Sequence, residues 1–95
     1  MLAAVTAFSM LAEPTRLRLL WLVSAEELDV TTLADRVGTS VSAVSQHLGR
    51  LRLAGLVDTR RAGRHVIYRA VDAHVRSLIA AALSHAGHQV GEVDR

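Results

Sequence analysis

The middle of the chain contains two short helical patterns separated by one tight turn, and this arrangement limits the fold more than any other feature. Thr31 can cap a helix that ends at Gly38, since glycine suits the left-handed conformation past a helix C-terminus. Ser40 can cap a second helix that Gly55 stops. The inward face of this second helix is expected to consist of Val44, Leu48 and Leu51. The segment therefore predicts helix, tight turn, helix.

Further helices are expected on both sides of this segment. Residues 1–11 are interpreted as a helix rather than a signal peptide, because they have no basic leader. Pro14 opens a helix to about Ser24, where proline at the first position loses no hydrogen bond. A last helix with a regular apolar stripe should begin at Asp72 and end at Gly87, followed by a short polar tail.

A hairpin is predicted between the second helix of the pair and the last helix. Leu56–Arg60 and Val66–Ala70 are rich in β-branched residues, and residues 61–64 connect them. A helix pair followed by a basic hairpin is the arrangement of a winged helix-turn-helix. The expected fold class is mainly α with a small β-hairpin, a winged helix-turn-helix with five helices.

The length and the absence of cysteine exclude several classes of protein. A chain of 95 residues forms one domain, over residues 1–95, and is too small for most enzyme scaffolds. Without cysteine there are no disulfides, thiolate nucleophiles or sulfur-rich metal cages, which is typical of a reducing cytosol. No apolar run approaches the roughly 20 residues that cross a bilayer. We expect a cytoplasmic protein that is neither an enzyme nor a membrane protein.

Positive charge is concentrated in the middle of the chain. All eleven basic residues are arginine. Residues 1–35 carry two arginines against five acidic residues, whereas residues 36–76 carry eight against two, a net charge of +6. Residues 77–95 have a net charge of −1. Such a distribution favours binding to a polyanion over a merely solvated arginine-rich face.

The exposed face of the second helix has side chains that suit base edges in a major groove. A glutamine amide can pair with adenine through two hydrogen bonds, a serine hydroxyl can donate or accept, and a small apolar group can contact a thymine methyl. The candidates for this face and its flanks are Val41, Ser42, Ser45, Gln46, His47 and Arg50. The alternative is an ordinary polar helix face, which the adjacent basic hairpin makes less attractive.

Four further arginines are candidates for contacts with the DNA backbone. They are Arg52, Arg60, Arg61 and Arg64. These arginines can bind phosphates, or a narrow minor groove at the tip of the hairpin, and so fix the position of the protein rather than read sequence. The expected partner is therefore double-stranded DNA.

The last helix carries a pattern of possible metal ligands, Asp72, His74, His85 and His88. The eleven-residue step from His74 to His85 is only about 20° beyond three helical turns, so both point the same way. They are nevertheless about 16 Å apart, whereas ligands of one ion lie within a few ångströms of one another. One helix therefore cannot close the site.

A second copy of the chain can complete this site. If two last helices pack antiparallel about a two-fold axis, Asp72 and His74 of one meet His85 and His88 of the other, twice over. Three nitrogens and one carboxylate suit Zn(II), with Co(II) as a plausible mimic; Ni(II) would need further ligands, such as Glu92, Asp94 or water. The alternative is a helix-capping aspartate with histidines that favour the helix dipole.

With these residues in view, the chain resembles the ArsR/SmtB family of bacterial metal-responsive repressors over nearly its whole length. The matching segments are Leu-Ala-Glu-Pro-Thr-Arg-Leu-Arg at 11–18, Ser-Ala-Val-Ser-Gln-His-Leu at 42–48, the hairpin at 63–68 and the last-helix ligands. In members that sense soft metals a Leu-Cys-Val-Cys segment precedes the third helix, but Leu-Asp-Val-Thr stands here at 28–31. Sensing of arsenic, cadmium or lead through that site is therefore not expected.

The resemblance implies a homodimer, held by its first and last helices, that binds operator DNA without metal and releases it when metal binds. It also implies a hydrogen bond from the second ring nitrogen of His85 to a main-chain carbonyl near Gly55. Three alternatives remain: a nickel or cobalt sensor of the same fold, a winged-helix regulator with a non-metal effector, and a small zinc hydrolase. The last is disfavoured, because four protein ligands leave no open position for water.

Overall fold

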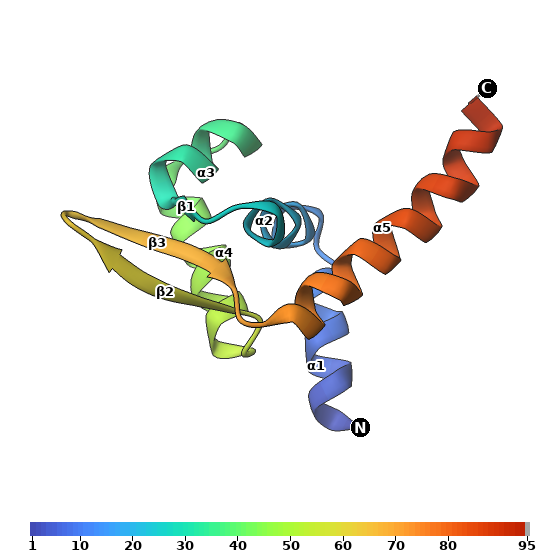
Figure 1. Ribbon diagram of the computed structural model, residues 1–95, viewed down its shortest axis with the longest axis horizontal. Helices are drawn as coiled ribbons and strands as arrows, with labels where there is room; N and C mark the ends of the chain where they lie inside the picture. The colour runs from blue at the N-terminus through green and yellow to red at the C-terminus, as the bar shows by residue number, and fades with distance from the viewer. Residues whose placement is uncertain (95) are drawn as a thin grey trace.

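The computed structural model describes the backbone of residues 1–94 and the side chains of residues 1–85. It contains five helices and a three-stranded antiparallel sheet within that range (Figure 1). The helices are α1 (Leu2–Leu11), α2 (Pro14–Ala25), α3 (Val30–Val37), α4 (Val41–Leu53) and α5 (Ala73–Asp94), and the strands are β1 (Leu28–Asp29), β2 (Val57–Ala62) and β3 (His65–Ala70). The predicted fold class, a mainly α winged helix-turn-helix, is confirmed.

The helix pair is built much as its capping residues predict. Ser40 Oγ accepts a hydrogen bond from the Ala43 amide at 3.1 Å, which begins α4. Gly38, with φ +76°, ends α3 in the left-handed conformation. The predicted cap of α3 is wrong, however: Asp29, not Thr31, caps it by accepting from the Thr32 amide at 2.9 Å. A carboxylate accepts this bond better than a hydroxyl, so the helix starts at Val30.

The sheet contains one strand more than the predicted hairpin. β3 pairs with β2 on one side and with the two-residue strand β1 on the other, in the order β1-β3-β2. Tyr68 lies opposite Thr59 in β2 and opposite Leu28 in β1. β1 therefore ties the β2–β3 hairpin, which we call the wing, to the chain just before α3. The wing extends from one side of the helices, and α5 extends from the opposite side (Figure 1).

The end predicted for the last helix at Gly87 is wrong, as is the polar tail after it. The backbone of α5 is helical to Asp94. A glycine inside a helix costs about 1 kcal/mol relative to alanine but does not by itself end the helix. Within residues 1–94 no helix combines the length and apolar character that a bilayer crossing requires.

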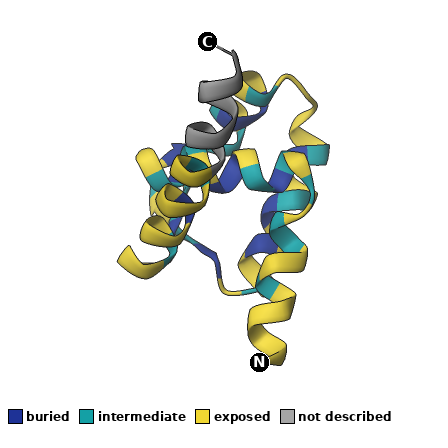
Figure 2. Ribbon diagram, turned by 90° about the vertical axis from the view of Figure 1, so that its right-hand side faces the viewer, coloured by how far each residue is buried: buried dark blue, intermediate teal, exposed yellow. Residues whose placement is uncertain are grey.

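The core is aliphatic and lies where α2, α3, α4 and the base of the wing meet (Figure 2). The predicted inward face of α4 is confirmed, since all three of its residues are fully buried. α5 contributes Ile79, which is 1% exposed. By contrast α1 has no buried residue, although its sequence is largely apolar. The first helix is thus attached to the domain without being part of its core.

Candidate nucleic-acid interface and metal centre

The start of α4 presents a free polar surface. Val41, Ser42, Ser45 and Gln46 are all exposed, and the three buried residues of this helix lie on its other side. The Val44 amide donates to the Ser40 carbonyl at 3.0 Å, so the helix is regular from its first turn and holds these side chains in place. They form a compact set of donors, acceptors and one small apolar group, the chemistry that base edges require.

His47 does not share this surface. Its ring is 25% exposed and turned toward α2, where Nδ1 lies 3.4 Å from Nη1 of Arg16 and 3.7 Å from Oε2 of Glu13. This partial exposure agrees with the predicted position of His47 on the flank of the exposed face, and its contact with DNA stays a prediction. One helical turn on, its neighbour Arg50 is exposed.

The last turn of α4 adds positive charge beside a shallow hollow. Arg50 and Arg52 are exposed, and together with Gln46, Gly49 and Leu53 they line a hollow of about 740 Å³. Because Gly49 lacks a side chain, the helix surface between the arginines is flat. A phosphate backbone can approach such a surface closely.

The three candidate arginines of the wing differ in their surroundings. Nε of Arg60 donates to Oε1 of Glu27 at 2.6 Å, so this guanidinium is neutralised within the chain. Arg61 and Arg64 are exposed and have no hydrogen bond or ion pair with the side chains that the structure describes. The two arginines nearest the tip therefore carry the free charge of the wing.

Two acidic residues around β1 hold the wing, and the sequence interpretation missed both. Besides the bond from Glu27 to Arg60, Oδ2 of Asp29 lies 3.2 Å from Nδ1 of His65. The pKa of Asp29 is lowered mainly by hydrogen bonds from Thr32, with a smaller contribution from His65. Only the three acidic residues within 26–29 could have indicated that this segment holds the wing, because β1 is too short for a periodic pattern.

Asp72 and His74 lie together at the start of α5. Oδ1 of Asp72 accepts from the Val75 amide at 3.0 Å and so caps the helix, and it is 3.8 Å from Nδ1 of His74. The His74 side chain is 98% exposed and that of Asp72 53%. His85 is exposed further along the helix, and the side chain of His88 lies outside the described residues. No three potential ligands among the described side chains come together.

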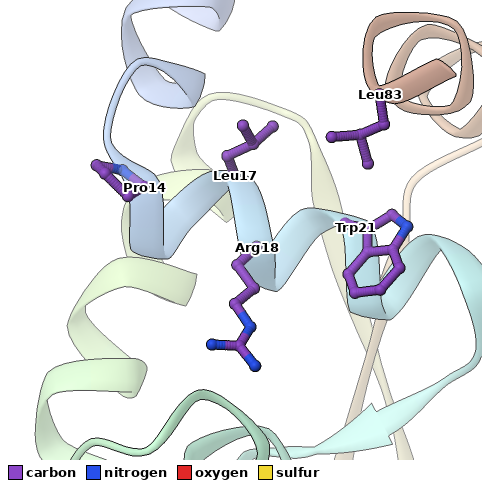
Figure 3. Close-up of a pocket in the computed structure, with 5 residues that line it drawn as sticks. All are labelled: Pro14, Leu17, Arg18, Trp21 and Leu83. Carbon is purple, nitrogen blue, oxygen red and sulfur yellow. The ribbon is translucent and has the colours of Figure 1, made fainter. Parts of the chain in front are cut away.

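An apolar recess lies between α2 and α5 (Figure 3). It has a volume of about 440 Å³ and is lined by Pro14, Leu17, Arg18, Trp21 and Leu83. Leu83 of α5 faces Leu17 and Trp21 of α2 across it, while the guanidinium of Arg18 points away. The surface around the last helix is therefore apolar as well as ligand-bearing.

Comparison with known proteins identifies the family. A helix-turn-helix domain model matches residues 11–60. The regulator KmtR of Mycobacterium tuberculosis is 45% identical over 84 residues, which cover 88% of this chain and 65% of KmtR. The transcriptional repressor SmtB homolog of Synechocystis is 48% identical over 71 residues, 75% of this chain and 54% of that protein. The chain belongs to the ArsR/SmtB family. It spans between about half and two thirds of these two relatives.

A solved structure agrees with this membership. The homodimeric winged helix-turn-helix DNA-binding domain of Mb0332 from Mycobacterium bovis, a possible ArsR-family regulator, superposes with a TM-score of 0.82 at 30% identity. The match covers 88% of this chain and 78% of that one. Membership of the ArsR/SmtB family groups the chain with relatives that are named transcriptional regulators. Its fold is that of a winged helix-turn-helix DNA-binding domain.

Proposed function

We propose that the chain is a metal-responsive repressor, which binds operator DNA as a metal-free homodimer and releases it when Zn(II) binds between two α5 helices. The observation that carries the proposal is the placement of potential ligands on α5. Asp72 and His74 are exposed at its start, and His85 is exposed about three turns further on. The start of α5 and the turn that carries His85 thus each offer part of a site.

The donor chemistry fits a tetrahedral divalent ion. Imidazole nitrogen and carboxylate oxygen are ligands that zinc accepts. Because His74 and His85 are about 16 Å apart along the helix, one chain cannot supply both to one ion. An antiparallel partner helix would bring the start of one α5 to the far end of the other. The set Asp72, His74, His85 and His88 remains the proposed ligand set.

Exposed apolar side chains support pairing of two copies. Phe8 and Val5 of α1 are 61% and 55% exposed, and α1 and much of α5 lie on the surface (Figure 2). The apolar recess beside Leu83 lies next to the ligand-bearing helix. A small domain that leaves this much apolar surface uncovered is expected to bury it against another molecule. We therefore assign the dimer interface to α1 and α5.

Operator binding is assigned to α4 and the wing. In a dimer of this fold the two reading helices enter successive major grooves about 34 Å apart, so the relative position of the two lobes decides the affinity. Zinc bound across the interface would fix the two α5 helices relative to each other. Ligand and DNA oppose each other only if they favour different arrangements of the dimer. Coupling of this kind is commonly about 1 to 3 kcal/mol per effector.

The test is zinc titration of the full chain bound to a fluorescently labelled operator. His85→Ala should bind the operator nearly as the wild type does but keep it at zinc concentrations that release the wild type. His65→Ala is the matched control, because it removes a histidine outside the ligand set and should leave zinc sensitivity unchanged. Wild-type release from the His85→Ala protein would remove this residue from the metal site.

A second candidate function has one observation in its favour, the helix cap that Asp72 makes with the Val75 amide. In that alternative the aspartate is structural and the effector is not a metal. Asp72→Asn separates the two functions, since asparagine caps a helix as well but is a weaker ligand. Loss of zinc-induced release in this variant would favour the metal site, whereas failure of zinc to release the operator from the wild-type chain would favour the alternative. Competition with Ni(II) and Co(II) identifies the preferred ion.

A further inference from the structure

Arg16 is the one buried charged side chain among residues 1–85, being 8% exposed. Its Nε donates to the main-chain carbonyl of Met10 at 2.8 Å, near the end of α1. Its Nη1 lies 3.4 Å from Nδ1 of His47 on α4. One guanidinium on α2 therefore touches both the first helix and the reading helix.

A carboxylate completes this junction. Oε2 of Glu13 accepts from the Arg16 amide at 2.8 Å, which caps α2, and lies 3.7 Å from Nδ1 of His47. The pKa of Glu13 is lowered, mainly by that backbone hydrogen bond and in part by His47. Nδ1 of the histidine thus has one permanent cation and one carboxylate within reach.

The protonation state of His47 decides which of these partners it can use. A guanidinium is only a donor, so Nδ1 can bond to Arg16 only while it carries a lone pair. Once protonated, Nδ1 becomes a donor beside a like charge, and the carboxylate of Glu13 is the remaining acceptor.

We propose that Arg16 and His47 are positioning residues for DNA binding, which join the end of α1 to the reading helix through a bond that exists only while His47 is neutral. Proton uptake moves the ring from Arg16 toward Glu13 and separates α4 from the residue that holds α1. The inference rests on DNA binding by α4 and not on the proposed metal response.

The junction acts on DNA affinity through the position of α4. His47 directly follows Ser42–Gln46 on the same helix, so a change in its contact tilts or shifts the base-reading side chains. The charged groups beside the ring are Glu13 and Arg16 of α2, and on α4 itself Arg50 follows one turn later. If only the free protein takes up the proton, operator affinity falls as pH falls, by up to tenfold per pH unit for each chain of the bound protein.

The experiment measures operator affinity of the full chain from pH 8 to 5.5, with chelator present so that metal plays no part. His47→Asn keeps an acceptor near the position of Nδ1 but cannot titrate. We expect the slope of log Kd against pH to be shallower than the wild-type slope by up to one for each chain of the bound protein. Glu13→Gln removes the carboxylate that receives the imidazolium, so its loss of affinity should shift to lower pH.

Melting curves of both variants establish that they are folded. A folded His47→Asn protein with the wild-type pH slope would overturn the proposal. If that variant does not fold, Glu13→Gln decides, and an unchanged pH profile overturns it. The nitrogen NMR shifts of the His47 ring give a second test at pH 8. They should show Nε2 protonated and Nδ1 bare, and a proton on Nδ1 would contradict the bond to Arg16.

Discussion

Two arginines of the same wing should contribute very differently to DNA binding. A protein that neutralises one phosphate changes the slope of log K against log salt by about 0.9. Arg64 is exposed and has no ion pair with the described side chains, so Arg64→Ala should lower the slope by about that amount for each wing that contacts the DNA. Between 50 and 200 mM salt each such contact makes the loss of affinity about 3.5-fold smaller than in the wild type.

Arg60 is expected to contribute little, because Glu27 already neutralises it. The two side chains are 47% and 43% exposed and their Nε and Oε1 atoms are 2.6 Å apart. A guanidinium in such a pair releases few counterions, so Arg60→Ala should change the slope by much less than Arg64→Ala. Glu27→Gln should free the guanidinium and raise the slope by up to about 0.9.

The assay is fluorescence anisotropy of a labelled operator at five or more salt concentrations, with a scrambled duplex in parallel. Because phosphate contacts carry no sequence information, the slope should change alike on both duplexes. Equal decreases for Arg60→Ala and Arg64→Ala would refute the reasoning, since the ion pair with Glu27 would then have no effect on charge at the DNA. Unchanged binding by Arg64→Ala would dismiss the contact at the wing tip.

Gly38 and Gly49 should respond oppositely to alanine in urea denaturation at one protein concentration. Gly49→Ala should stabilise the fold by about 1 kcal/mol, because no other part of the chain lies within 4 Å of the new methyl. Gly38→Ala should destabilise it by a similar amount, about 1 kcal/mol, since its φ is +76°; matching signs would contradict this. Leu48→Ala, at a fully buried site, should cost about 2 to 5 kcal/mol. Asp29 has a lowered pKa, so its ionised form adds stability that is lost as pH falls through that lowered value. The melting temperature of Asp29→Asn should therefore fall less in acid than that of the wild type. The same decrease of melting temperature with pH in both proteins would dismiss this contribution. Zinc should release the operator less readily at pH 5.5 than at pH 8, because imidazole ligands must be deprotonated.

The elements with a local chemical signal were predictable from sequence. Ser40 and Gly38 mark the turn between α3 and α4 because a cap and a left-handed residue are properties of single positions. The buried face of α4 followed from helical spacing alone. The fold class needed only these signals and the β-branched residues of the wing.

The contacts that depend on the tertiary fold were not predictable. β1 has two residues and exists because β3 lies beside it, so no pattern announces it. The flank position of His47 follows from helical spacing, but its contacts with Glu13 and Arg16, about thirty residues away, do not. Likewise nothing near Arg60 indicates that Glu27 neutralises it. The metal site needs ligands from a second copy of the chain and from His88, whose side chain lies outside the described residues, so the site stays a prediction.

The helix α1 gains no buried residue from its own domain. Ala7, Met10 and Leu11 pack against the core, but Val5 and Phe8 are exposed. The order of the first turns of α1 should therefore follow the amount of whatever covers these exposed side chains, by mass action. If a second copy of the chain covers them, dilution of the protein should loosen the first turns of α1 and leave the core intact. Operator titrations run at nanomolar protein and melting curves run at micromolar protein would then report on two different degrees of order, and the difference would be largest around Val5 and Phe8.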